Sequence, residues 1–114
     1  MNKAQAIAAL AALAQDTRLD IFRCLIRQGS QGLAAGQIAE QIGVPQSTLS
    51  FHLKTLRQAG LIGCRRESRS LIYHTDFATM NELLGYLTEQ CCQDAPDRCG
   101  LTLWPDTANS DSKT

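Results

Sequence analysis

The sequence predicts a mainly α-helical domain that carries one small β-hairpin. Three observations support this fold class. Apolar residues recur at helical spacing in three consecutive segments of the first half. A longer segment with a leucine stripe follows, between Pro45 and Gly60. Two short strand-like segments then flank a polar turn at residues 67–70, which is the pattern of a hairpin.

The early segments are bounded by residues that begin or end helices. Helices are expected over about residues 3–14, 16–28 and 35–41. The first is rich in alanine, with Ile7 and Leu10 on one face, and it needs a partner surface to bury that face. Asp16 is expected to cap the second helix, and Gly29 to end it. Gly43 closes the third.

The segment 44–60 combines a buried stripe with a polar face. Pro45 is tolerated in a first helical turn, and Gly60 is a typical residue beyond a helix end. The stripe comprises Leu49, Leu53 and Leu56. The opposite face carries Gln46, Ser47, Thr48, Phe51, Lys54 and Thr55. Small polar groups followed by a cation suit DNA base edges and phosphates, whereas a polar surface helix without a partner is the simpler alternative.

An arginine-rich hairpin follows this helix and favours DNA binding. The expected strands are 61–66 and 71–75, and the basic residues in and beside the turn are Arg65, Arg66 and Arg69. A polar helix followed by a basic hairpin is a winged helix-turn-helix, whose recognition helix enters the major groove. The arginines are expected along the DNA backbone, where they add affinity without sequence information.

The last helix is expected over about residues 76–92, with Asp76 as its cap. The first and last helices show more apolar surface than a three-helix core can cover, which predicts a homodimer built from these two helices. We therefore expect residues 1–92 to form the DNA-binding and dimerisation domain. Residues 93–114 are expected to be a cysteine-bearing tail, disordered past about residue 105.

Length and charge agree with a single soluble domain. The chain has 114 residues, zero net charge and no apolar run long enough to span a bilayer, so a cytoplasmic protein is expected. The charge is unevenly placed: residues 45–74 carry five cations against Glu67, a local +4, and residues 75–114 carry two cations against seven acids, a local −5. Such asymmetry is expected when one segment meets phosphate. An enzyme is not expected, since no nucleophile, base and acid set can be assembled.

Three runs of residues resemble the ArsR/SmtB family of bacterial metal-responsive repressors. They are Ile38-Ala-Glu, the run from Gln46 to Leu61, and Arg69-Ser-Leu-Ile-Tyr-His, and the resemblance covers about residues 4–92. It implies a dimer that represses its target until an inducer binds. The family's recognition-helix motif is matched by Gln46, Ser47, Thr48, Ser50, Phe51 and His52, and its wing by Arg65, Arg66 and Arg69. His52 has an alternative role, a hydrogen bond within the fold.

The cysteines carry the clearest signal for an inducer. Five cysteines without a secretory signal indicate reduced thiols rather than a disulfide framework. The candidate metal ligands are Cys91, Cys92 and Cys99, with Pro96 turning the chain so that Cys99 can approach the pair. Three soft sulfur ligands suit As(III), which is three-coordinate, whereas tetrahedral zinc would need a fourth donor.

The resemblance adds to this prediction. Zinc-sensing relatives place Asp and His ligands along the last helix, which has no His here, and the Cys-Cys-x6-Cys pattern looks like arsenic-responsive members. It implies an arsenite-responsive repressor that releases its operator DNA when As(III), or Sb(III), binds the thiolates.

The sequence is also compatible with two alternatives. The first is a redox or persulfide sensor of the same fold, because relatives of that type use one Cys in an early helix and one at the end of the last, and here Cys24 and Cys92 lie near those positions. Cys24 has apolar neighbours and is expected to be buried, and Cys64 is expected to pack rather than bind. The second is a metal-binding interaction module that does not bind DNA.

Overall fold

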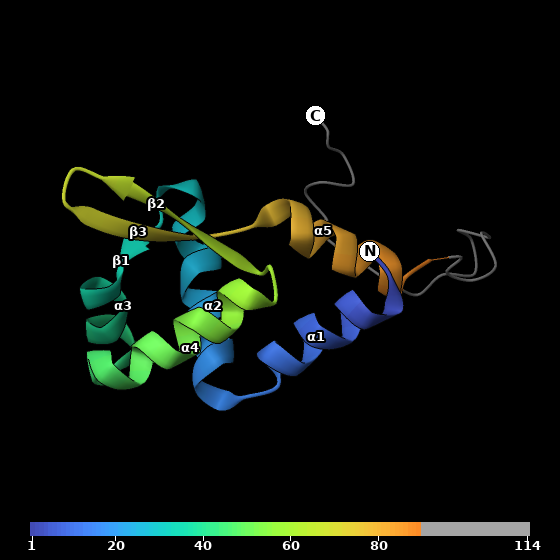
Figure 1. Ribbon diagram of the computed structural model, residues 1–114, viewed down its shortest axis with the longest axis horizontal. Coiled ribbons are helices and arrows are strands. Elements are labelled where there is room, and N and C mark those ends of the chain that lie inside the picture. The colour runs from blue at the N-terminus through green and yellow to red at the C-terminus, as the bar shows by residue number, and fades with distance from the viewer. Residues whose placement is uncertain (90–114) are drawn as a thin grey trace.

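The structure, a computed structural model, describes residues 1–89. Its elements are α1 (Lys3–Leu13), α2 (Asp16–Gln28), the 3-10 turn η1 (Gly29–Gln31), β1 (Leu33–Ala34), α3 (Ala35–Ile42), α4 (Gln46–Gln58), β2 (Ile62–Glu67), β3 (Ser70–Thr75) and α5 (Phe77–Leu87). The β2–β3 hairpin and α3 lie at one end of the molecule, α1 and α5 lie side by side at the other, and α2 and α4 lie between them (Figure 1). This is the predicted winged helix-turn-helix, mainly helical with a small antiparallel sheet.

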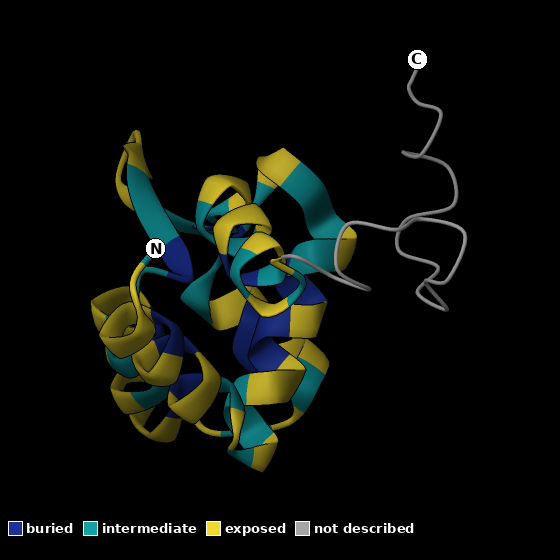
Figure 2. Cartoon of the chain, turned by 90° about the vertical axis from the view of Figure 1, so that its right-hand side faces the viewer, coloured by how far each residue is buried: buried dark blue, intermediate teal, exposed yellow. Residues whose placement is uncertain are grey.

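The core lies where the helices and the base of the hairpin meet. Its fully buried large side chains are Ile21, Leu25, Ile38, Leu49, Leu56 and Leu61. The predicted leucine stripe of α4 is buried throughout, because those residues lie on one face of the helix. Figure 2 shows the buried residues on the inner faces and the exposed ones on the outer faces of the helices.

The face of α1 that packs on the protein is made of alanines. Ala6, Ala9 and Ala12 are buried, while Ile7 is 58% and Leu10 42% exposed. The sequence predicted that the face of α1 with the larger residues needs a partner surface. In the structure no other part of the described chain covers Ile7 and Leu10. Small residues let α1 approach α2, α4 and α5 closely, while Ile7 and Leu10 point outward and Leu13 packs partly buried against the core.

The sheet has three antiparallel strands in the order β1-β3-β2. β1 has only two residues and was not predicted, because two residues carry no periodic signal. It pairs Leu33 with Tyr73. Gly32, just before it, has φ +69°, and a Cβ there would collide with the carbonyl oxygen of Tyr73. The turn after α2 is therefore pressed directly against β3.

Two expected helix ends are corrected by the structure. The cap of α2 is Gln15 rather than Asp16, since the Gln15 side chain accepts the backbone N–H of Arg18 at 2.8 Å. The last helix begins after its predicted cap, Asp76, but ends at Leu87 rather than residue 92. The hydroxyl of Thr88 donates to the carbonyl of Leu84 at 2.7 Å and so occupies an acceptor at the helix end.

The predicted tail, 93–114, and its expected disorder lie outside the described residues. Within residues 1–89, no helix is long and apolar enough to cross a membrane.

Candidate nucleic-acid interface

The helix-turn-helix unit consists of α3, α4 and the tight turn between them. Gly43 ends α3 in the left-handed conformation, φ +83°, so the chain can reverse within three residues. Pro45 then precedes α4 as its N-cap. Because Leu49, Leu53 and Leu56 hold α4 on the core, the orientation of its outer face is fixed.

The outer face of α4 presents the predicted reading residues to solvent. Exposed are Gln46, Ser47, Thr48, Ser50, Phe51 and Lys54. Phe51 is 66% exposed, the largest exposed fraction among the large hydrophobic residues of the described chain. An exposed ring between polar residues suits a thymine methyl group in a major groove. The Ser50 hydroxyl donates to the carbonyl of Gln46 at 3.1 Å, which leaves its oxygen lone pairs free to accept.

His52 faces away from this group. It is partly buried, and its Nδ1 lies 3.4 Å from Nη1 of Arg18, whose Nε donates to the carbonyl of Ala12 at 2.7 Å. Burial lowers the pKa of His52, and the positive charge of Arg18 lowers it further. A neutral imidazole can accept the arginine hydrogen bond, so His52 links α4 to α2. This geometry matches the alternative role that the sequence left open, and direct DNA contact by His52 stays a prediction.

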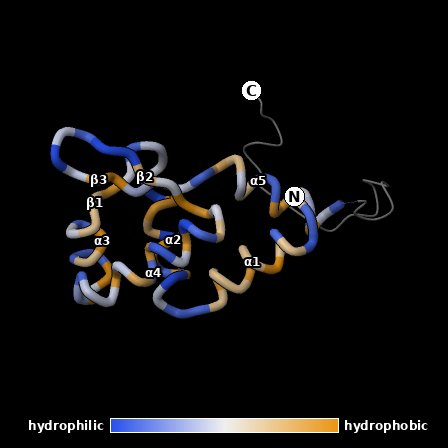
Figure 3. Tube along the Cα trace, viewed as in Figure 1, coloured by the Kyte–Doolittle hydropathy of each residue, from blue (hydrophilic) through white to orange (hydrophobic). Residues whose placement is uncertain are grey.

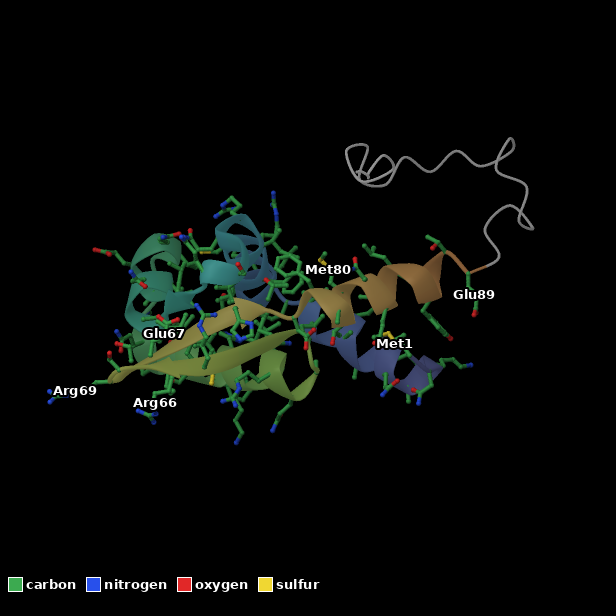
Figure 4. The ribbon with its side chains drawn as sticks, turned by 90° about the horizontal axis from the view of Figure 1, so that it is seen from above. Met1, Arg66, Glu67, Arg69, Met80 and Glu89 are labelled. Carbon is green, nitrogen blue, oxygen red and sulfur yellow. The ribbon has the colours of Figure 1, made fainter. Side chains whose placement is uncertain are left out.

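The wing carries two exposed arginines and one engaged arginine. Arg66 and Arg69 are exposed; Arg69 lies at the tip of the hairpin and Arg66 points away from the sheet (Figure 4). Arg65 instead binds Glu67 and two backbone carbonyls of the turn after α2. The hydropathy trace shows the hairpin end as one of the most hydrophilic parts of the described chain (Figure 3).

An open hollow of about 520 Å³ lies between α4 and β2. It is lined by Lys54, Arg57, Gln58, Ile62, Gly63 and Cys64. Arg57 is the functional candidate that the prediction missed. The signal was present, because Arg57 follows Lys54 by three residues and so shares its helix face. Two cations beside backbone groups of a strand edge form a surface suited to a phosphate of the DNA backbone.

The predicted metal ligands Cys91, Cys92 and Cys99 lie outside the described residues. Within residues 1–89, no three His, Cys, Asp or Glu side chains are grouped so that they could hold a metal ion. Cys24 is buried and its Sγ donates to Oε1 of Gln41 at 3.2 Å. Burial raises the pKa of the Cys24 thiol, an effect that nearby Arg27 partly offsets. Cys64 is half-buried in the hollow beside α4.

Comparisons with known proteins agree with this geometry. A helix-turn-helix domain family matches residues 13–65. The transcriptional activator HlyU of Vibrio cholerae is 30% identical over 92 residues, which cover 81% of this chain and 82% of HlyU. The uncharacterized HTH-type transcriptional regulator YceK of Bacillus subtilis is 41% identical over 59 residues, 52% of this chain and 58% of YceK.

Solved structures agree as well. The homodimeric winged helix-turn-helix domain of Mb0332 from Mycobacterium bovis, described as a possible ArsR-family regulator, aligns with a TM-score of 0.60 and 29% identity over 79% of this chain and 83% of that one. An ArsR-like regulator from Rhodococcus shares the fold, with a TM-score of 0.68 and 24% identity over 83% of this chain and 86% of that one.

Proposed function

The chain belongs to the ArsR/SmtB family of winged helix-turn-helix transcriptional regulators, and we propose that it is a dimeric repressor released from operator DNA by As(III). DNA binding is the part that the described residues support most directly. The observation that carries it is the joint exposure of the polar face of α4 and of Arg66 and Arg69 on the wing.

Each exposed group has a role in the proposed complex. Gln46, Ser47, Thr48 and Ser50 present amide and hydroxyl groups for base edges, and Phe51 an apolar ring. Lys54 and Arg57 bind phosphates beside the major groove, and Arg66 and Arg69 bind the backbone that the wing reaches. The first set supplies sequence preference, and the second supplies affinity and orientation.

Dimerisation through α1 and α5 is supported by the apolar residues that these helices leave exposed. Ile7 and Leu10 of α1 and Leu87 of α5, which is 53% exposed, remain uncovered in one protomer. The two helices pack on each other, and the Met1 amino group lies 3.8 Å from Oε1 of Glu82 on α5. An isologous contact between two such pairs would bury this surface and set the spacing of two recognition helices.

The inducer part of the proposal depends on Cys91, Cys92 and Cys99. They follow closely after Leu87, where α5 ends, so a metalloid that draws them together would pull on the end of the dimer helix. α5 is also joined to the wing: the N–H of Asp76, between β3 and α5, donates to the carbonyl of Leu61 at 2.9 Å. A displacement of α5 would therefore change both the dimer and the wing, and paired half-sites tolerate little change in spacing.

The redox alternative is weaker for this chain. It needs Cys24 as a reactive thiolate, yet Cys24 is buried, hydrogen-bonded to Gln41 and has a raised pKa. Thiols in such surroundings react slowly, because the thiolate is the nucleophile. Redox sensing would then have to rest on Cys92 with another partner.

The test is DNA binding by fluorescence anisotropy with arsenite, antimonite, zinc or peroxide added. The probe is a duplex of about 30 base pairs selected by the protein from random sequence, long enough for two half-sites. Release of DNA by arsenite or antimonite, but not by zinc or peroxide, supports the proposal. Release by peroxide alone supports the redox alternative, and failure to select any duplex would favour the interaction module. Since HlyU is named an activator, a reporter gene behind the selected site should also show whether this chain represses.

A further inference from the structure

We propose that Arg65 is a positioning residue that fixes the angle of the wing, and that it affects DNA affinity through this position rather than by binding phosphate. The inference rests on the DNA-binding function proposed above. It concerns a residue that the sequence placed with Arg66 and Arg69, since nothing in the sequence distinguishes the three.

The guanidinium of Arg65 is engaged on three sides. Its Nη1 donates to the carbonyl of Ser30 at 3.0 Å and its Nη2 to the carbonyl of Gln31 at 2.7 Å. Its Nε donates to Oε2 of Glu67 at 2.6 Å, an ion pair within β2. The planar fork thus joins the wing strand to the η1 turn, and its charge already has an anionic partner.

Strand geometry separates Arg65 from its neighbour. Consecutive side chains of a strand point to opposite faces, so Arg66 projects from the face opposite Arg65. Arg65 pairs across the hairpin with Ile72, and a Cβ on Gly32 would meet the Cγ2 of Ile72 at 2.8 Å. The η1 turn therefore lies over the Ile72 position, within reach of Arg65, and away from the exposed side of Arg66.

This turn is an effective anchor because it leads directly into the DNA-reading unit. η1 runs through the two residues of β1 into α3, and α3 packs on α4. β1 holds the turn to β3 on one side, and Arg65 holds it to β2 on the other. With both links made, the hairpin and α4 keep one relative orientation, in which Arg66 and Arg69 meet the backbone while α4 reads bases. Without Arg65 the wing has to be ordered when DNA binds, and this costs affinity.

Lysine cannot replace this arrangement. An ammonium group carries the same charge, but it lacks the planar fork that reaches two adjacent carbonyls and a carboxylate together. At a phosphate contact the two cations are more nearly equivalent, because there the charge does most of the binding. Arg65→Lys therefore separates the two roles. DNA affinity falls if Arg65 positions the wing, and it is largely kept if Arg65 binds a phosphate.

The test measures operator affinity against salt for Arg65→Lys, Arg65→Gln, Arg66→Lys and Arg66→Gln. We expect Arg65→Lys to bind about 3- to 10-fold more weakly than wild type, and Arg66→Lys to stay within about 2-fold. We expect Arg66→Gln to reduce the slope of log affinity against log salt by about 0.9 per protomer. Arg65→Gln should leave that slope unchanged, because Arg66 and Arg69 still meet the backbone once the loosened wing is ordered in the complex, and the ordering cost does not depend on salt. Wild-type affinity in Arg65→Lys, or an equal loss of slope in Arg65→Gln, would overturn the proposal.

A second readout needs no DNA. Hydrogen exchange of the amides at residues 30–34 and 64–73 should be faster in Arg65→Lys than in Arg66→Lys, with similar melting temperatures for both. Glu67→Gln should give an intermediate result, since it weakens the ion pair but keeps both carbonyl bonds. Equal exchange rates in all variants would contradict the proposal that Arg65 holds the wing to the η1 turn, whatever the DNA result. If the wild type selects no duplex, DNA binding fails and the exchange readout still decides whether Arg65 holds the wing.

Discussion

The salt dependence of DNA binding can be worked out from the cations that the structure places on the DNA-binding face. Each protomer presents four: Lys54 and Arg57 at the hollow beside β2, and Arg66 and Arg69 on the wing. Arg65 is not included because its guanidinium is engaged within the fold. A dimer would then neutralise about eight phosphates, which predicts a slope of log affinity against log salt of about −7.

Neutralising half of these cations should remove half of the slope. In the Arg66→Gln, Arg69→Gln double variant we expect about −3.5, because four phosphate contacts per dimer are lost and four remain. The matched control is Arg23→Gln, since Arg23 lies on α2 in a pocket with Asp20, Arg27 and Gln41. Its slope should equal that of the wild type.

The assay is fluorescence anisotropy over about 50 to 200 mM salt with the selected duplex. A wild-type slope weaker than about −2 would refute the assignment of the face as a whole. An unchanged slope in the wing double variant would refute the role of the wing. Loss of slope in the Arg23 control would show that α2, rather than the wing, faces the DNA.

Three further predictions concern stability and assembly. Gly32→Ala should destabilise the fold by about 1 to 3 kcal/mol more than Gly29→Ala in urea unfolding, because both glycines have φ near +69° but only Gly32 meets Tyr73 and Ile72; equal losses would contradict this packing. Because the pKa of His52 is lowered in the fold, the unfolded chain binds the proton more readily. The contribution of neutral His52 to the free energy of unfolding is therefore present above the ordinary histidine pKa of about 6.5 and is lost as pH falls below it. Wild type should therefore lose more stability than His52→Gln between about pH 7.5 and 5.5, and parallel losses would count against the partly buried position of His52 beside Arg18. Ile7→Glu with Leu10→Glu should weaken the dimer more than about 100-fold by sedimentation, whereas Phe51→Glu on α4, at a side chain more exposed than either, should not. A monomeric Phe51→Glu variant would show that the dimer interface lies on α4 rather than on α1 and α5.

The helices and the hairpin could be predicted from the sequence because their signals are local. The leucine stripe of α4 and the glycines that end α2 and α3 each act within a few residues. β1 could not be predicted in this way, since the pairing of Leu33 with Tyr73 depends on a strand that lies far along the chain. Which face of α1 is buried was also hidden, because the close approach of helices selects alanine over the larger Ile7 and Leu10.

In the candidate site too, local features could be predicted from the sequence and tertiary contacts could not. Exposure of Gln46, Ser47 and Phe51 follows from helical periodicity and was predictable. The different surroundings of Arg65 and Arg66 were not, because they depend on which face of β2 meets the η1 turn. The contact of His52 with Arg18 likewise joins residues of two helices that sequence spacing does not relate.

The proposed arsenite switch depends most on the link between the cysteine-bearing end of the chain and release of DNA. The measurement that tests it directly is arsenite titration of the preformed complex, followed by anisotropy, for wild type, Cys99→Ser and Cys64→Ser. We expect arsenite to release DNA from wild type and from Cys64→Ser, and to leave Cys99→Ser bound. Cys64 serves as the control because it lies in the hollow beside α4 and not among the proposed ligands. Normal release from Cys99→Ser, or no release from wild type, would contradict the proposed arsenite switch.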